Sequence, residues 1–315
     1  MRFCIGLLLV ILQTNPLFAR QADSLKNVRY GNAKSWKDAD QPLSMDVYFP
    51  VRESGKHYPL VMLMHGGGFL YGSKEAMRSH CKILADSGFI AVTINYRKGW
   101  ERGSKLRCNA DLLQLQKAVY RSTQDANTAL RFLMSQRNEY TIDTAWIFVG
   151  GSSAGGILAL NLAYLKQEAA DKLLPEASQE LGLLRPAAAP GQSFSIKGIC
   201  NMWGALSDSS LVTRQNALPT IFYHGTDDII VPFDIGRFGT MCGKYPLMYG
   251  SACIYRQTVA AGKAAILNVS QGGNHGPKEF YSKITMSNTA CFFKQVIQGR
   301  ANGATIHNVA KAGCR

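Results

Sequence analysis

The chain has 315 residues, of which 46% are hydrophobic and 18% are charged, and this composition suits one large globular domain with a sizeable core. Its formal net charge is +14, but the basic residues are spread along the chain and form no recognisable nucleic-acid-binding motif. The composition therefore argues against a nucleic-acid partner and favours a solvated basic surface.

The first residues have the pattern of a secretory signal peptide. Arg2 supplies a positive charge, an unbroken apolar run covers residues 4–12, and a cleavage site follows Ala19. The run is too short to span a bilayer, and a short membrane anchor or a buried strand is the alternative. We expect an exported chain, periplasmic or secreted, with a signal peptide over 1–19, one domain over 20–298 and a frayed polar tail over 299–315.

Export would place the cysteines in an oxidising compartment, where disulfide bonds form. The sequence has 8 cysteines, and without Cys4 of the signal segment 7 remain, whose connectivity cannot be read from the sequence. Cys242 and Cys253 flank a turn-rich segment and are the first expected pair. Cys200 lies in an apolar run and is expected to be a buried thiol. No cysteine or histidine cluster has metal-ligand spacing, so we expect no metal and no cofactor.

Apolar periodicity predicts strands that alternate with helices. The expected strands are residues 43–49, 59–64, 89–96, 144–149, 196–203, 220–223 and 264–269. Helices are expected over residues 74–87, over residues 110–134 as one long helix or a pair of helices, directly after residue 153, and after the last two strands. The alternation implies a mainly parallel sheet that is covered by helices on both faces. Arg121 and Asp125 stand four residues apart on one helix and are expected to form an ion pair.

A glycine loop directly follows the expected strand 59–64. Residues 65–69 read His-Gly-Gly-Gly-Phe, and the three glycines leave backbone N–H groups unshielded beside a bound molecule. A dinucleotide-binding loop is the alternative, but the spacing is not G-x-G-x-x-G and no acidic ribose-binding residue follows a second strand. The loop is therefore a candidate for stabilising an oxyanion.

Residues 151–155 read G-x-S-x-G between an expected strand and an expected helix. A strand, a sharp turn and a helix form the context in which this motif carries a nucleophilic serine, and the glycines prevent clashes in the turn. An ordinary glycine-rich turn is the alternative. Ser153 has a glycine two residues before it and two residues after it, whereas Ser152 does not, so Ser153 is the better candidate.

An activated serine needs a general base, and the base needs an orienting acid. The loop after the strand 220–223 contains Asp227 and Asp228, either of which could be the acid or simply part of a turn. His275 lies in the glycine-rich loop after the last expected strand and is the candidate base, with an exposed loop histidine as the alternative. His224 directly precedes a glycine and is expected to be structural.

Together these motifs resemble the α/β-hydrolase superfamily, and in particular carboxylesterases with an HGGG loop. The nearest type is the bacterial secreted feruloyl or acetyl esterase. The matching residues are 43–48, 65–69, 95–97, 150–156, 224–232 and His275. The resemblance covers about residues 30–298 and implies an α/β-hydrolase fold, with a mainly parallel, eight-stranded-type sheet, helices on both faces and a small insert or lid.

The resemblance also assigns roles to particular residues. It implies Ser153 as nucleophile, His275 as general base and then general acid, and Asp228 as orienting acid. It favours Asp228 over Asp227 because the family's aspartate stands three residues before a Val-Pro pair, here at Val231. The implied oxyanion donors are the backbone N–H groups of Gly67, Gly68 and Ala154.

The implied activity is that of a secreted serine carboxylesterase, which hydrolyses small acyl or aryl esters, including carbohydrate-linked acetyl or feruloyl esters, through an acyl-enzyme. The alternatives are a serine peptidase on the same fold and a non-catalytic, glycan-binding hydrolase-like protein. Residues 98–110 and 168–195 match no family pattern, and a pocket or a lid would be built there. The expected partner is a small-molecule or carbohydrate-linked ester, with no nucleic acid and no stable membrane span.

Overall fold

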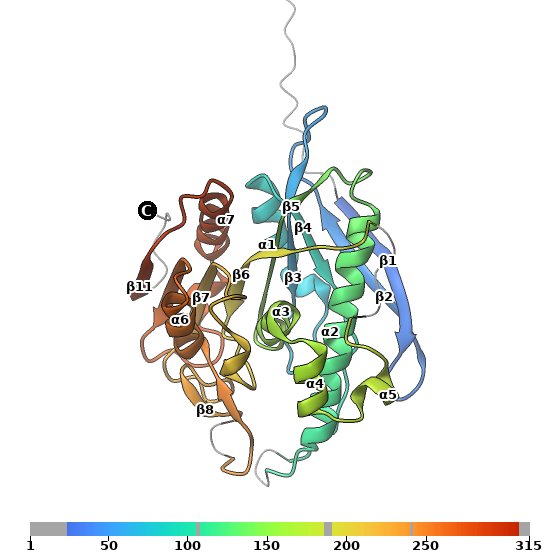
Figure 1. Ribbon diagram of the computed structural model, residues 1–315, viewed down its shortest axis with the longest axis vertical. Helices are drawn as coiled ribbons and strands as arrows, with labels where there is room; N and C mark the ends of the chain where they lie inside the picture. Colours follow the sequence, from blue (N-terminus) through green and yellow to red (C-terminus); the bar gives the residue numbers. More distant parts are fainter. Residues whose placement is uncertain (1–23, 105–107, 186–190, 240–241, 309–315) are drawn as a thin grey trace, which may run out of the picture.

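The computed structural model describes residues 24–104, 108–185, 191–239 and 242–308 (Figure 1). The expected signal peptide over 1–19 lies outside the described residues, and so do residues 186–190 of the segment 168–195. The division into a domain over 20–298 and flanking segments stays a prediction.

The main sheet of the described chain has nine strands in the order β1-β2-β4-β3-β5-β6-β7-β10-β11. These strands are β1 (Ser24–Lys34), β2 (Asp40–Tyr48), β3 (Tyr58–Met64), β4 (Ile90–Ile94), β5 (Ile142–Ser152), β6 (Ile196–Met202), β7 (Thr220–Gly225), β10 (Ala265–Ser270) and β11 (Ala304–Asn308). A separate hairpin consists of β8 (Ile235–Arg237) and β9 (Leu247–Tyr249).

The α-helices are α1 (Arg78–Asp86), α2 (Leu112–Ser135), α3 (Ala154–Tyr164), α4 (Gln167–Leu173), α5 (Ala177–Leu181), α6 (Ser251–Ala260) and α7 (Lys283–Ile297). Three short 3-10 helices are η1 (Lys74–Met77), η2 (Ser209–Leu211) and η3 (Lys278–Tyr281). The expected helix over 74–87 is therefore present as η1 followed by α1, and the expected helix over 110–134 is present as α2.

The sheet is mainly parallel, as the alternation of strands and helices predicted. Only the pairs β1–β2 and β2–β4 are antiparallel, and every other neighbouring pair in the main sheet is parallel. The edge strands β1 and β11 were not expected from the sequence. The prediction of a frayed tail after residue 298 is wrong for Ala304–Asn308, because this segment pairs with β10 and completes the sheet edge.

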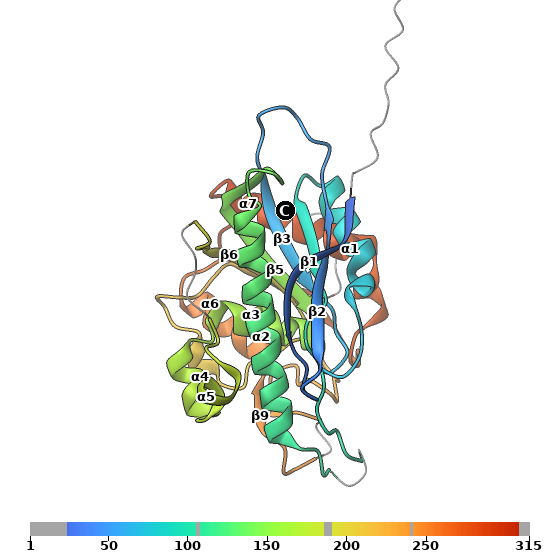
Figure 2. The same ribbon diagram turned by 90° about the vertical axis from the view of Figure 1, so that its right-hand side faces the viewer.

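Helices cover both faces of the sheet, and β3 shows why. Val61 and Leu63 point into the core cluster that contains α1 and α7, whereas Met62 and Met64 point into the cluster that contains α2, α3 and α6. A strand that is buried on both faces reads as a continuous apolar run, which is the pattern of this segment. Figure 2 shows α1 and α2 on opposite sides of the strands between them.

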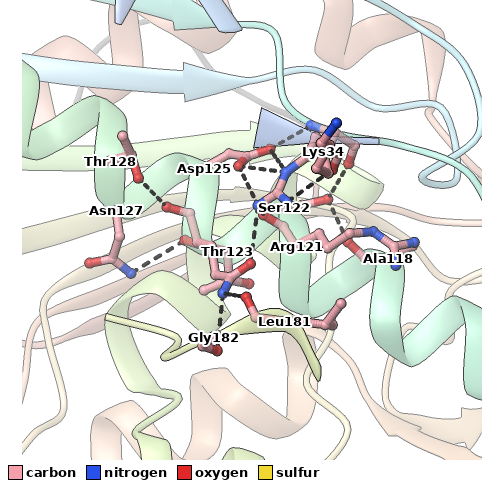
Figure 3. A network of polar contacts seen from close by, with 12 residues as sticks. Lys34, Ala118, Arg121, Ser122, Thr123, Asp125, Asn127, Thr128, Leu181 and Gly182 are labelled. Atoms are coloured by element: carbon pink, nitrogen blue, oxygen red, sulfur yellow. Dashed lines mark hydrogen bonds and ion pairs between the residues drawn. The ribbon is translucent and has the colours of Figure 1, made fainter. Parts of the chain in front are cut away.

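A buried ion pair joins α2 to the loop after β4, and it differs from the expected pair. The Asp125 carboxylate accepts hydrogen bonds from the backbone N–H of Arg97 at 2.7 Å and from its Nε at 2.9 Å. Arg121 instead donates to the carbonyl oxygen of Gly99 at 3.0 Å, so the predicted pair of Arg121 and Asp125 is wrong. Figure 3 shows the polar contacts around Asp125 on α2. Gln124 of the same helix donates to the carbonyl oxygens of Leu181 and Gly182 at the end of α5.

A disulfide bond joins Cys108 to Cys242, with their Cα atoms 5.5 Å apart. The expected pair of Cys242 and Cys253 is therefore wrong, because Cys253 lies on α6 as a free and buried thiol while the loop of Cys242 reaches the segment before α2. Cys200 is a free and buried thiol, as expected.

We expect the substitution Asp125→Ala to lower the free energy of unfolding by about 3 to 5 kcal/mol, because it leaves the buried guanidinium of Arg97 without its carboxylate. Urea denaturation followed by circular dichroism measures this loss. Asp234→Ala is the matched control, since Asp234 pairs with Arg256 where both side chains are about half exposed, and its loss should be much smaller. Equal losses for the two variants would contradict the prediction.

Candidate active site

Ser153 occupies a sharp turn between β5 and α3. Its φ is +55° and its ψ is −119°, a backbone conformation that is strained for a residue with a side chain. Two hydrogen bonds hold the turn: the N–H of Ser153 donates to the carbonyl of Met202 at 2.8 Å, and its carbonyl accepts from the N–H of Ile157 at 2.9 Å. The turn therefore presents the serine at the carboxyl edge of the sheet.

The glycines that flank the serine are required by close backbone contacts. A Cβ on Gly151 would lie 2.5 Å from the carbonyl oxygen of Met64, and a Cβ on Gly155 would lie 2.0 Å from the same oxygen. No side chain fits at such distances, so the turn can form only with glycine at both positions. This is the clash that the G-x-S-x-G spacing predicted.

Ser153, His275 and Asp228 form a continuous row of hydrogen bonds. The Oγ of Ser153 lies 2.8 Å from Nε2 of His275, and Nδ1 of His275 lies 2.7 Å from Oδ2 of Asp228. The three residues follow β5, β10 and β7, whose carboxyl ends meet at one edge of the parallel sheet. The structure thus brings together three residues from separate parts of the sequence.

The Asp228 carboxylate is buried and fully hydrogen-bonded. Its Oδ1 accepts from the backbone N–H groups of Ile230 and Val231, each at 2.9 Å, and its Oδ2 accepts from His275 and also lies 3.2 Å from Nε2 of His224. Burial alone would raise the pKa of Asp228, but the hydrogen bonds from the two histidines outweigh it and hold the pKa well below its usual range. Asp228 therefore stays ionised across the physiological range.

Asp227 is placed differently from Asp228. Its side chain is exposed and accepts a hydrogen bond from the neighbouring Thr226 hydroxyl at 2.9 Å. The two aspartates, which the residues alone left as alternatives, are thus separated by the direction of the chain at the end of β7. Only the carboxylate of Asp228 contacts His275.

The glycine loop lies against the serine turn. A Cβ on Gly66 would lie 3.3 Å from Cβ of Ser153, and Gly67 and Gly68 have φ values of +119° and +59°. At Gly67 a Cβ would also lie 2.2 Å from the carbonyl oxygen of Tyr71, so this position requires glycine on two grounds. The N–H of Ala154 is the first in α3 and has no acceptor within the helix.

His65 holds the base of the glycine loop. Its ring stacks on Tyr96 with centroids 4.3 Å apart, and its Nδ1 donates to the carbonyl of Gly66 at 2.6 Å. The hydroxyl of Tyr96 donates to the carbonyl of His65 at 2.7 Å. Burial lowers the pKa of His65 to about 4, so the ring is neutral at pH 7 and its role at the loop is to bind the backbone.

A mostly apolar pocket of about 620 Å³ opens at Ser153 and His275. The two segments that matched no family pattern both contribute to it: Trp100 comes from 98–110, and Leu174 comes from 168–195. Sequence reasoning missed the part of the wall that comes from the β8–β9 hairpin and its loop. Those residues are Phe238, Gly239, Cys242, Tyr245, Pro246 and Met248.

The sequence between β7 and α6 gave no signal for this part of the wall, because β8 and β9 have three residues each and are too short for an alternating pattern to be visible. Two bonds fix it to the segment before α2: the Cys108–Cys242 disulfide, and a hydrogen bond of 3.1 Å from the N–H of Ala110 to the hydroxyl of Tyr245.

Among the described residues, no three His, Cys, Asp or Glu side chains are grouped so that they could hold a metal ion. In the same part of the chain, no helix is both long enough and apolar enough to cross a membrane.

Comparison with solved structures finds the same fold in bacterial esterases. The propionate-bound esterase Est2 of Thermogutta terrifontis is 18% identical, covers 90% of this chain and 96% of its own, and has a TM-score of 0.58. The apo form of esterase 2 from the same organism has a TM-score of 0.60. A truncated carbohydrate esterase from gut microbiota is also 18% identical, with a TM-score of 0.58 over 88% of this chain and 96% of its own. These likenesses show the fold.

Curated relatives match only part of the chain. The non-reducing polyketide synthase Preu6 of Preussia isomera is 26% identical over 152 residues, which are 48% of this chain and 6% of that protein. The chain therefore spans only a small fraction of the length of such relatives. The BD-FAE family model matches residues 45–207, a range that includes the glycine loop and the serine turn. The chain therefore belongs to the BD-FAE family, and its fold is that of the esterases named above.

Proposed function

We propose that the chain hydrolyses small acyl or aryl esters through an acyl-enzyme formed on Ser153, with His275 as general base and Asp228 as the orienting acid. The observation that carries this proposal is the row of hydrogen bonds of 2.8 Å and 2.7 Å that joins the three side chains at the pocket. A nucleophile bonded to a base, which is bonded to a carboxylate, is the arrangement that serine hydrolysis needs.

In the first step, Oγ of Ser153 attacks the ester carbonyl carbon while Nε2 of His275 takes its proton. Asp228, held by two backbone N–H groups, stabilises the imidazolium and keeps Nδ1 of His275 turned towards itself. The negative carbonyl oxygen of the tetrahedral intermediate would accept hydrogen bonds from the amides of the implied donors, Gly67, Gly68 and Ala154.

In the second step, the imidazolium of His275 gives its proton to the departing alkoxide, and the alcohol leaves. Water then attacks the acyl group on Ser153 while His275 takes a proton from the water. A second tetrahedral intermediate collapses, the carboxylic acid leaves, and Ser153 recovers its proton from His275. Every proton transfer in the two steps passes through His275.

The lining of the pocket supports an apolar acyl or aryl group in the substrate. Its aromatic and aliphatic side chains, such as Trp100, Leu174 and Phe238, would remove such a group from water. One structural neighbour is an esterase with bound propionate, and another is a carbohydrate esterase. These two neighbours support short acyl groups and carbohydrate-linked esters as the first candidate substrates. The signal-like first residues and the Cys108–Cys242 bond support an exported protein, periplasmic or secreted.

Ser153→Ala should lower kcat/KM for p-nitrophenyl acetate on the order of 10⁴- to 10⁶-fold and abolish labelling by a fluorophosphonate probe, since no other group replaces the nucleophile. Ser152→Ala is the matched control, because the neighbouring serine ends β5 and is expected to retain labelling. Labelling of Ser153→Ala at the wild-type rate would show that the serine is not the nucleophile.

A substrate panel tests the ester class. We expect turnover of short-chain nitrophenyl esters, methyl ferulate or acetylated xylan, and little turnover of chromogenic peptides. Activity on long-chain esters alone would contradict the carbohydrate-esterase proposal and favour a lipase, and preferred turnover of peptides would favour a peptidase.

The disulfide bond should affect bulky substrates more than small ones, because it fixes the part of the pocket wall that lies between β8 and β9. We expect the double substitution Cys108→Ser/Cys242→Ser to lower kcat/KM for methyl ferulate by about tenfold and that for p-nitrophenyl acetate by less than about twofold, as expected when positioning is lost remote from the reacting atoms. An equal loss for both esters would contradict the prediction.

A further inference from the structure

Beyond the Ser153–His275–Asp228 row, the buried His224 contacts the same carboxylate as the proposed base. It lies on β7 with no exposed side-chain surface. Its Nε2 is 3.2 Å from Oδ2 of Asp228 and 3.1 Å from the carbonyl oxygen of Val231. A carbonyl oxygen can only accept, so Nε2 carries a hydrogen and donates to both oxygens.

The opposite nitrogen of the ring faces Ser251, the first residue of α6. Nδ1 of His224 lies 2.8 Å from Oγ of Ser251, and this Oγ accepts a hydrogen bond of 3.1 Å from Nδ2 of Asn201. The amide of Asn201 is oriented by the N–H of Gly204, which donates to its Oδ1 at 3.1 Å. The directions of the hydrogen bonds from Gly204 to Asn201 and from Asn201 to Ser251 are therefore determined.

This arrangement selects the form of His224 that carries its hydrogen on Nε2. Within the described residues, Nδ1 of His224 is the acceptor that the Ser251 hydroxyl hydrogen can reach. If Nδ1 were protonated, that hydroxyl hydrogen would be buried without an acceptor, which costs free energy. A neutral imidazole with the hydrogen on Nε2 satisfies every group from Asn201 to Asp228.

Because Nε2 of His224 carries a hydrogen, Oδ2 of Asp228 accepts hydrogen bonds from two imidazole rings. His275 binds it at 2.7 Å and His224 at 3.2 Å, while Oδ1 is occupied by two backbone N–H groups. The titratable groups that act on Asp228 are these two histidines, one from β7 and one from the loop after β10. A second donor on the same oxygen weakens its attraction for the His275 imidazolium.

We propose that His224 is a positioning residue which, held by Ser251 and Asn201, sets how strongly Asp228 stabilises the protonated form of His275. The proposal rests on the proposed function, since it concerns the base of that reaction. His224 touches no substrate and acts through Asp228. His224, Ser251 and Asn201 thereby extend the row of three side chains to α6 and β6.

Asn201 also contacts the helix that follows the serine turn. A Cβ on Gly156 of α3 would lie only 2.7 Å from Oδ1 of Asn201. Asn201 therefore packs directly against the helix that follows Ser153. Asn201 therefore contacts both the hydrogen-bonded chain that leads to Asp228 and the helix that begins directly after Ser153. A change at His224 is transmitted through side chains that have no room to rearrange.

The test compares His224→Asn with His224→Gln through the pH dependence of kcat/KM for p-nitrophenyl acetate. The Gln amide nitrogen replaces Nε2 and keeps a donor to Asp228, whereas the Asn amide replaces Nδ1 and leaves Asp228 without that donor. We expect the acidic limb of the profile to move to higher pH by about half a unit to one unit in the Asn variant. The Gln variant should keep the limb within about 0.2 units of the wild type.

Ser251→Ala gives a second measurement with a smaller change in the core. Loss of the hydroxyl that donates to Nδ1 makes Nε2–H a weaker donor, so the limb should move in the same direction but by less than in His224→Asn. A limb that stays in place in both variants, with kcat lowered equally at every pH, would show that His224 is merely structural and overturn the proposal.

Nitrogen-15 NMR of the imidazole rings in the wild-type protein tests the same geometry without any variant. We expect the ring hydrogen of His224 to lie on Nε2 and not on Nδ1, and a hydrogen on Nδ1 would overturn the proposal. Failure of the proposed function is distinguishable, because it would appear as absent turnover in the wild type while the tautomer of His224 could still be measured.

Discussion

The site depends on one close contact, between the carbonyl oxygen of Met64 at the end of β3 and the backbone of the serine turn. Gly151 and Gly155 both approach this oxygen so closely that a Cβ at either position would overlap it. The contact brings the glycine loop beside Ser153 and forces the serine into its positive φ. In this conformation the Ser153 side chain contacts His275, and His275 contacts Asp228, at the sheet edge where β7 and β10 end.

Much of the fold and of the site could be predicted because the informative residues stand at the ends of buried parallel strands. A continuous apolar run such as residues 58–64 specifies a strand with both faces covered, and the carboxyl ends of such strands meet at one edge. Residues 122 positions apart, Ser153 and His275, could therefore be placed together from local patterns alone. Their proposed roles also depend on chemistry that the motifs share with known esterases.

The features that the sequence did not reveal depend on contacts between distant segments. Helical spacing showed that Arg121 and Asp125 share one side of α2, but not that Arg97 would approach from the loop after β4. Strands at the sheet edges, such as Ala304–Asn308, have one neighbour and little apolar pattern, so pairing with β10 could not be read locally. His224 looked structural, and only its geometry shows that it binds the same carboxylate oxygen as His275.

The disulfide bond between Cys108 and Cys242 has a consequence for the order in which the chain can mature. The two cysteines are 134 residues apart, and β5, β6 and β7 lie between them in the sequence. During synthesis from the N-terminus, Cys108 can pair with Cys242 only after the three central strands between them have been made. This part of the pocket wall is therefore fixed only after β5, β6 and β7 have been made, and oxidation of Cys108 before that point would join it to another partner.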